Sequence, residues 1–201
     1  MNKVYPIFPT PIYKTQLKNI VSQKDLDMFK NKKQTCFKNE GNFVSRNTHI
    51  LDNSFPKLKE AFMIHINNYF KDIICTTNKI TPYITQSWLN YTEEDQHHHH
   101  HSHSNSIVSG VFYVSADREH DSIKFYKPGN SVIQFRHKDY NLYNSTSWKF
   151  NVETNDLVLF PSSLEHSVEK KKGSNLRISL AFNVFIKGNI GKEDDLNDLS
   201  L

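Results

Sequence analysis

The sequence is poor in the residues and runs that mark several classes of protein. It has only two cysteines, Cys36 and Cys75, which do not form a CxxC pair. Two such cysteines make no disulfide framework, and this usage is typical of a reducing compartment. Six glycines and seven prolines exclude a collagen-like or linker-like chain. No apolar run is long enough to cross a bilayer, and the amino terminus has no basic-then-apolar pattern, so we expect no membrane-spanning, secreted or lipid-anchored protein.

The residues that are present are those of a globular domain. Hydrophobic residues make up 37% and aromatic residues 12% of the 201 residues, which is enough for one domain with its own core. The net charge of +4 permits an anionic partner but does not argue for nucleic acid. Because no stretch interleaves aromatic and basic residues, we do not expect a nucleic-acid partner.

The amino-terminal third favours helices after one edge strand. Two prolines and alternating apolar residues in Pro6–Leu17 are typical of an edge strand with turns. Ser22 and Asp25 have the spacing of a capping box and predict the start of a short amphipathic helix. Pro56 is tolerated in a first helical turn. The helix predicted after it carries apolar residues three and four positions apart, from Leu58 to Ile73.

After Thr76 the pattern changes to short runs rich in Val, Ile, Phe and Tyr, separated by turn residues. The predicted strands are Tyr83–Tyr91, Ile107–Val114, Ser122–Tyr126, Val132–Arg136, Ser147–Val152, Leu157–Phe160, His166–Lys170 and Arg177–Ile186. Consecutive short strands with helices confined to the amino-terminal third predict a mainly β (α+β) fold, a sandwich or barrel with helices packed outside.

We expect residues 1–201 to form a single domain. In it, 1–78 would be a helical support and 79–187 the sheet core, and 188–201 would be a polar, loosely ordered tail.

Histidine is the unusual residue of this composition. The chain has eleven histidines, and six of them lie between His97 and His103. On an extended segment, residues i and i+2 point to the same side, so His101 and His103 are suited to bind one metal ion. The pair His99 and His101 is the alternative register. We interpret the rest of the tract, His97–His100, as a polar loop that also has affinity for nickel or zinc.

Two further residues complete a possible metal site. His166 follows an apolar strand and a turn, which places an imidazole at the edge of a sheet. Arg177 begins the last strand and is followed by the alternating apolar Ile178, Leu180 and Phe182, so its side chain is predicted to point inward. A buried guanidinium needs an anionic partner. Histidine ligands on one face of a metal with an arginine nearby are typical of non-haem iron sites that use a dicarboxylic cosubstrate.

The ordered set of motifs resembles the iron(II)/2-oxoglutarate-dependent dioxygenases. More narrowly, it resembles their short microbial and phage branch related to prolyl hydroxylases. The resemblance reaches to about Phe185. Its motifs, in order, are Ile7-Phe-Pro-Thr-Pro-Ile-Tyr13, Trp88-Leu-Asn90, His101-Ser-His103-Ser-Asn105, Ser109-Gly-Val-Phe-Tyr-Val114, Phe160-Pro-Ser-Ser-Leu-Glu-His166 and Arg177-Ile-Ser-Leu-Ala-Phe-Asn183. The fold that it implies is a double-stranded β-helix (jelly-roll, cupin-like).

The resemblance also implies roles for individual residues. His101 and His166 are similar to the first and last metal ligands, and Arg177 to the residue that binds the C5 carboxylate of 2-oxoglutarate. Tyr113 is similar to the tyrosine that contacts the same carboxylate. Ser179, two residues after the arginine on the same face, and Asn90, on a neighbouring strand, are the remaining cosubstrate-binding candidates.

His103 stands where most of the superfamily has an acidic residue. Three neutral imidazoles leave more positive charge on the metal than two imidazoles and a carboxylate, and are expected to hold Fe(II) less tightly. In the alternative, His103 is not a ligand and a water takes its place.

The resemblance implies an Fe(II)- and 2-oxoglutarate-dependent dioxygenase that hydroxylates an organic substrate, releases succinate and CO₂, and is served by ascorbate as reductant. The alternative is a cupin-like metal-binding module without oxygenase activity, because one fold hosts many functions. The expected partner is a small molecule or peptide, with no membrane, and the sequence does not give the oligomeric state. We expect a cytoplasmic protein of a bacterium or a phage-infected host; the many Asn, Lys and Ile residues are typical of an AT-rich genome, as in a phage or marine bacterium.

Overall fold

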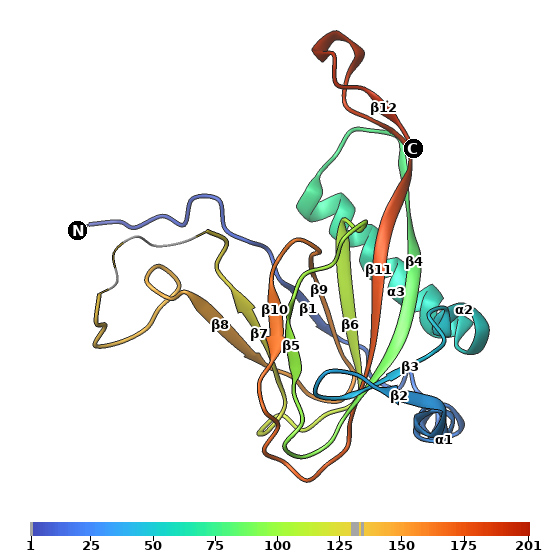
Figure 1. The fold of residues 1–201 in the computed structure, drawn as a ribbon. Coiled ribbons are helices and arrows are strands. Elements are labelled where there is room, and N and C mark those ends of the chain that lie inside the picture. Colours follow the sequence, from blue (N-terminus) through green and yellow to red (C-terminus); the bar gives the residue numbers. More distant parts are fainter. Residues whose placement is uncertain (1, 130–132, 134) are drawn as a thin grey trace.

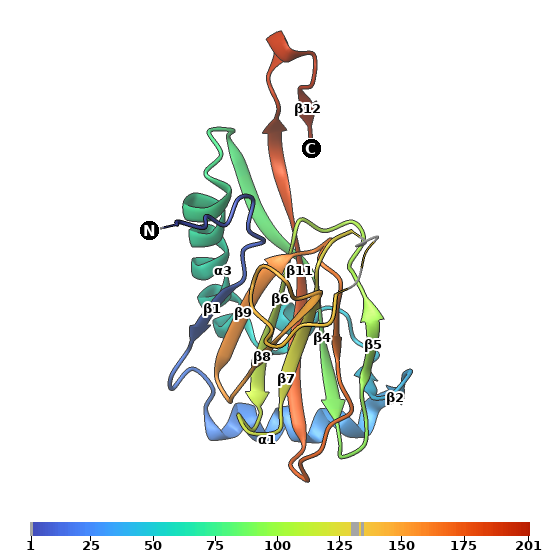
Figure 2. The same ribbon diagram turned by 90° about the vertical axis from the view of Figure 1, so that its left-hand side faces the viewer.

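Two antiparallel sheets face each other in the computed structural model, which describes residues 2–129, 133 and 135–201 (Figure 1). In spatial order the large sheet contains β1 (Tyr13–Gln16), β9 (Asp156–Pro161), β6 (Val108–Ser115), β11 (Arg177–Ile190), β4 (Ile80–Thr92), β3 (Phe43–Ser45) and β2 (Cys36–Lys38), with β12 (Leu199–Ser200) paired to β11. The small sheet contains β5 (His98–His101), β10 (His166–Val168), β7 (Ser122–Tyr126) and β8 (Ser147–Asn151). Turned by 90°, the view shows β7 and β8 in front of β6 and β11 (Figure 2).

The helices lie in the amino-terminal part of the chain. They are α1 (Gln23–Lys32), α2 (Ile50–Ser54) and α3 (Pro56–Tyr69), with short helical turns η1 (Lys33–Thr35), η2 (Phe70–Ile74) and, near the carboxyl end, η3 (Glu193–Asp195). Among the residues that the structure describes, no helix is both long and apolar enough to cross a membrane.

The large sheet buries both of its faces because side chains alternate along each strand. On β6, Val108, Phe112 and Val114 pack with the helices on the outer face, whereas Val111 and Tyr113 face the small sheet. The helix α3 contributes Phe62 to the outer core, where its ring stacks on Phe182 of β11. Residues of odd number on β6 and β11 therefore line the space between the sheets, which is where a site can form.

The predicted architecture is confirmed in its main features. The fold is mainly β with helices packed on the outside, and the predicted strands correspond to β4, β6, β7, β8, β9, β10 and β11. Ser22 caps α1 in a reciprocal capping box with Asp25, and Pro56 is in the first turn of α3. The strand predicted within Pro6–Leu17 is β1, at an edge of the large sheet.

Three expectations differ from the structure. The tract His97–His100 was interpreted as a polar loop, but His98–His100 belong to strand β5, because its backbone pairs with β10. The tail expected to be loosely ordered begins inside β11 and returns as β12 in a hairpin that projects from the rest of the molecule (Figure 1). The strands β2 and β3 were not predicted from the sequence. The predicted strand Val132–Arg136 falls on residues that include some outside the described part.

Candidate metal and cosubstrate site

Two histidines lie directly opposite each other on the small sheet. His101 of β5 pairs with His166 of β10, and their rings are 4.3 Å apart between centroids. In each ring Nδ1 lies within hydrogen-bond distance of a backbone carbonyl, at 2.8 Å from His99 and 3.0 Å from Leu164. Because a carbonyl only accepts, Nδ1 carries the proton and Nε2 keeps its lone pair for a metal.

His103 joins this pair from the segment that follows β5. Its backbone N–H donates to the carbonyl of Ser162 at 2.9 Å, which holds the segment against the end of β9. Its Nε2 lies 3.3 Å from Nε2 of His166. Two nitrogens that share one ion at about 2.1 Å, at angles of roughly 90–110°, are about 3.0–3.4 Å apart. The ligand atoms of His101, His103 and His166 all lie within 4.8 Å of one another, so the group is arranged to hold a single ion.

Burial keeps these imidazoles neutral. Desolvation, followed by the neighbouring His101, lowers the pKa of His103 to about 4, and desolvation together with the same neighbour lowers that of His166 to about 3. The pKa of His101 is also lowered, mainly by desolvation. A neutral imidazole is the form that binds a metal, so the rings are in the right state at neutral pH. In the described part of the chain no carboxylate joins the group.

The predicted cosubstrate residues lie in one row across the large sheet. Ser179 of β11 pairs with Asn90 of β4 on one side and with Tyr113 of β6 on the other. Paired residues of neighbouring strands point to the same face, and all three side chains line the cleft between the sheets together with the histidines. The sheet register thus brings together residues that are up to 89 positions apart in sequence, between Asn90 and Ser179.

Arg177 stands two residues from Ser179 on the same face and is 3% exposed. One of its terminal nitrogens donates to the carbonyl of Ser122 at 3.0 Å, and the guanidinium lies 5.0 Å from the centroid of the Tyr113 ring. No carboxylate forms a salt bridge with Arg177 in the described part of the chain. The charge is therefore buried without a protein counter-ion, which is costly unless an anion binds.

Two buried polar atoms in this cleft have no hydrogen-bond partner among the described residues: Nε of Arg177 and the hydroxyl of Tyr113. Burial raises the pKa of Tyr113 to about 12, with Arg177 opposing the shift, so its hydroxyl remains a donor. Buried donors in proteins are almost always satisfied. A carboxylate in the cleft accepts from both, which is a direct reason to place an anionic ligand there.

Two residues that line the cleft, and one beside it, were not assigned to the site from the sequence. The ring of Trp88 is half-buried beside that of His103, 5.6 Å between centroids. His98 was expected in a loop, but it lines the cleft. Asn42 lies near the start of β3, where its amide contacts Asn90 at 3.5 Å and His98 at 3.2 Å. Their positions depend on the tertiary packing of segments distant in sequence.

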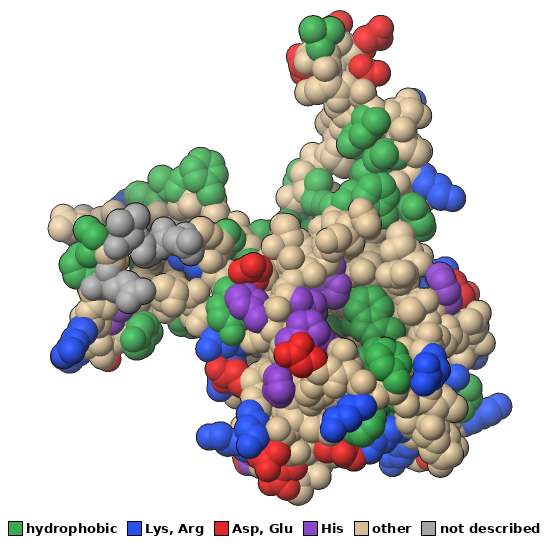
Figure 3. Space-filling model, viewed as in Figure 1, with side chains coloured by type: hydrophobic (Ala, Val, Ile, Leu, Met, Phe, Trp, Pro, Cys, Tyr) green, Lys and Arg blue, Asp and Glu red, His purple; other side chains and the backbone are tan. Residues whose placement is uncertain are grey.

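Seen from outside, histidine side chains gather in the centre of one face of the molecule, with acidic and apolar side chains around them (Figure 3). Of the histidines in the group, His101 and His103 are partly exposed, whereas His166 is buried.

Comparison with known proteins agrees with this geometry. Residues 86–183 match the family model described as putative 2OG-Fe(II) oxygenase. This segment runs from β4 to β11 and contains every one of the predicted site residues. Over this segment the chain is similar to the 2-oxoglutarate/iron(II) oxygenases. No curated protein matches the sequence.

Solved structures of this superfamily share the fold. An oxidoreductase of the 2OG-Fe(II) oxygenase family from Burkholderia pseudomallei is 12% identical, with a TM-score of 0.59 over 86% of this chain and 83% of that one. HygX from Streptomyces hygroscopicus, solved with nickel, 2-oxoglutarate and hygromycin B bound, is 12% identical with a TM-score of 0.57 over 87% and 82%. A prolyl hydroxylase from Trichoplax adhaerens, in complex with a peptide fragment of hypoxia inducible factor, is 10% identical with a TM-score of 0.55 over 87% and 83%.

Proposed function

We propose that this oxygenase binds Fe(II) through His101, His103 and His166, and 2-oxoglutarate through Arg177 and Tyr113, and hydroxylates an organic substrate. The observation that carries the proposal is the pair of unpartnered buried donors on Arg177 and Tyr113, which face the same cleft as the histidine group. A site that binds only a metal ion would leave both of these donors without an acceptor.

The residues suit both cofactors. Three neutral imidazoles suit a first-row divalent metal such as iron. The bound metal with 2-oxoglutarate and O₂ supplies the oxidising chemistry, with succinate and CO₂ as coproducts. The protein's own contribution is to bind, to orient and to exclude water.

Each side chain has a distinct task in this proposal. The guanidinium of Arg177 accommodates the distal carboxylate of 2-oxoglutarate, with the Tyr113 hydroxyl as a second donor. Ser179 and Asn90 line the same row and position the chain of the cosubstrate. The carbonyls of His99 and Leu164 hold the rings of His101 and His166 in the tautomer that presents Nε2 to the metal.

The substrate is a small molecule or a peptide. The related HygX and prolyl hydroxylase were solved with hygromycin B and with a peptide fragment, respectively, so both classes are reasonable first choices in a screen. A cupin-like module without oxygenase activity is not favoured, because it has no need of the buried cation at Arg177.

Anaerobic addition of Fe(II) and 2-oxoglutarate to the metal-free protein tests the proposal. We expect a weak visible charge-transfer band that requires both additions, since it arises when the cosubstrate chelates the iron. The matched variant Arg177→Met should need more 2-oxoglutarate to reach the same band. Iron binding by calorimetry without any such band would contradict cosubstrate chelation and favour the non-oxygenase alternative.

A further inference from the structure

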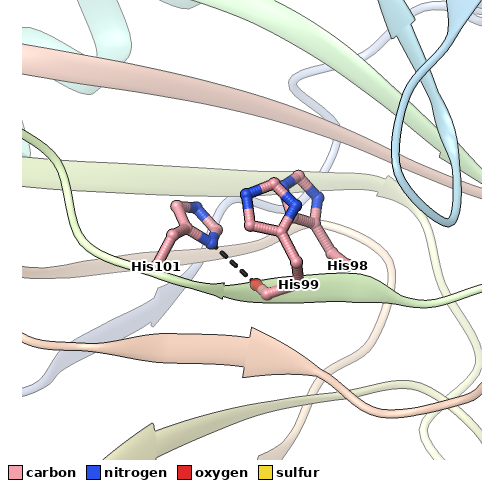
Figure 4. A group of neighbouring side chains, drawn as sticks. All are labelled: His98, His99 and His101. Atoms are coloured by element: carbon pink, nitrogen blue, oxygen red, sulfur yellow. Dashed lines mark hydrogen bonds between the residues drawn. The ribbon is translucent and has the colours of Figure 1, made fainter.

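A second group of histidines lies beside the first. The ligand atoms of His98, His99 and His101 lie within 4.8 Å of one another (Figure 4). Their ring centroids are 4.7 to 4.9 Å apart. This group is distinct from the proposed iron group except for His101, which belongs to both.

An irregularity in strand pairing explains the proximity. On a regular strand, His98 and His101 would point to opposite faces because they are an odd number of positions apart. In β5 the three steps from His98 to His101 are matched by only two steps on β10, from Val168 to His166. The extra residue is a β-bulge, and it turns His98 to the same side as His101. His100 points elsewhere: it stacks on Tyr126 and lies 3.2 Å from Glu165.

The group has free ligand capacity. Nδ1 of His99 is buried and has no hydrogen-bond partner among the described residues. Its lone pair is therefore available to bind a cation. Beside His98, the buried Oδ1 of Asn42 also has no partner, while the other end of that amide contacts His98 Nδ1 at 3.2 Å. If the amides of Asn42 and Asn90 both turn over, Oδ1 of Asn42 accepts from His98 Nδ1–H and from the Asn90 amide, and His98 Nε2 is free to bind a metal.

The shared histidine makes the two groups mutually exclusive. Nδ1 of His101 bonds to the carbonyl of His99 (dashed line in Figure 4), so only Nε2 has a lone pair. One nitrogen binds one ion. A metal on His98, His99 and His101 therefore removes a ligand from the group formed with His103 and His166.

We propose that His98, His99 and His101 form a second site for a divalent metal of the zinc class, and that occupation of this site excludes metal from the group of His101, His103 and His166. Three imidazoles and a water are a common tetrahedral set for Zn²⁺. The exclusion of iron as a regulatory event rests on the function proposed above, whereas the zinc site itself does not.

Calorimetric titration of the metal-free, full-length protein with Zn²⁺ tests the site. The variant His103→Gln/His166→Gln removes the proposed iron group and leaves the second group intact, so we expect it to bind one equivalent of Zn²⁺. Adding His98→Gln and His99→Gln should weaken that binding by more than about 100-fold, because two of the three ligands are lost and loss of an outer-shell partner alone costs about 10- to 100-fold.

The histidine tract provides its own matched control. Adding His97→Gln and His100→Gln instead removes the same number of imidazoles from the same segment, outside the proposed group. This variant should keep its zinc affinity within about threefold. Equal losses in the two quadruple variants would mean non-specific binding by the tract and would overturn the proposal, as would absence of binding to the His103→Gln/His166→Gln variant.

A second measurement does not need the quadruple variants. In the otherwise unchanged protein, zinc should abolish the band formed by Fe(II) and 2-oxoglutarate, and His98→Gln/His99→Gln should require at least about tenfold more zinc for the same loss. An unchanged zinc requirement contradicts the exclusion. If no band forms but the zinc titrations behave as expected, the proposed function fails and the second site stands.

Discussion

At the scale of single residues, two buried donors without a hydrogen-bond partner support the proposed cosubstrate site. Arg177 is 3% exposed and Tyr113 is 0% exposed. The Nε of Arg177 and the hydroxyl of Tyr113 have no acceptor in the described part of the chain. Evolution tolerates such donors when a ligand satisfies them. The histidines show the same principle, because burial keeps them neutral and available for a metal.

Replacing Arg177 by Met should weaken 2-oxoglutarate binding by about 10- to 100-fold, since charge-assisted hydrogen bonds contribute about 1.5–3 kcal/mol. Metal affinity should change less than threefold, because Arg177 is not a metal ligand. Calorimetry with the cosubstrate and with the metal separately measures both. Unchanged cosubstrate affinity would remove Arg177 from the proposed site.

The role of His103 as the third metal ligand can be tested by two substitutions at this position. His103→Ala should weaken Fe(II) binding by about tenfold or more. His103→Asp should bind Fe(II) more tightly than the Ala variant, because a carboxylate lowers the charge left on the metal. Anaerobic titration with Fe(II) measures the order. If His103→Ala binds iron as the unchanged protein does, a water rather than His103 completes the site.

At the scale of elements, the alternation along β6 and β11 separates core from site. Even-numbered residues of β11 pack under the helices, and the odd-numbered Arg177, Ser179 and Ala181 line the cleft. A slip by one residue would exchange the two sets. At one paired position, Gly110 of β6 faces Phe182 of β11, and a Cβ on Gly110 would lie 2.2 Å from the Phe182 ring.

Gly110→Ala should therefore lower the free energy of unfolding by about 1–3 kcal/mol through overpacking. Phe182→Leu in the same chain should recover part of that loss, because the ring is the obstacle. Denaturant unfolding of the two single variants and the double variant gives the coupling. Additive losses would show that the ring does not set the cost of the added methyl group.

At the scale of the whole molecule, the helical layer and the large sheet depend on one buried aromatic core. Tyr69 of α3 and Tyr91 of β4 are buried there, and the Tyr91 hydroxyl donates to the carbonyl of Phe29 on α1. Desolvation raises the pKa of Tyr69 to about 12 and raises that of Tyr91 further. These groups remain protonated in the folded state at a pH where the unfolded chain has already lost the protons.

The free energy of unfolding should consequently fall as pH rises above 10. Unfolded tyrosines ionise near pH 10 and the folded ones only near 12 or above, so the folded state binds more protons in that window. Each such tyrosine contributes a slope of up to about 1.4 kcal/mol per pH unit. Tyr69→Phe should reduce the slope of denaturant-derived stability against pH, whereas Tyr140→Phe, at a side chain that is 71% exposed, should not.

The sequence by itself determined the features that depend on residues close together in the chain. Short runs rich in Val, Ile, Phe and Tyr predicted β6, β7, β9 and β11, and the Ser22–Asp25 spacing predicted the capped start of α1. The order of motifs predicted the superfamily. Periodicity and capping act over a few residues, so a single chain displays them.

Only the tertiary structure decided which distant side chains meet. It placed Asn90, Ser179 and Tyr113 in one row through the pairing of β4, β11 and β6. It turned the histidine tract from an expected loop into β5, where a bulge that depends on pairing with β10 directs His98 toward His101. Register and bulges arise from contacts between strands far apart in the chain, and local sequence does not specify them.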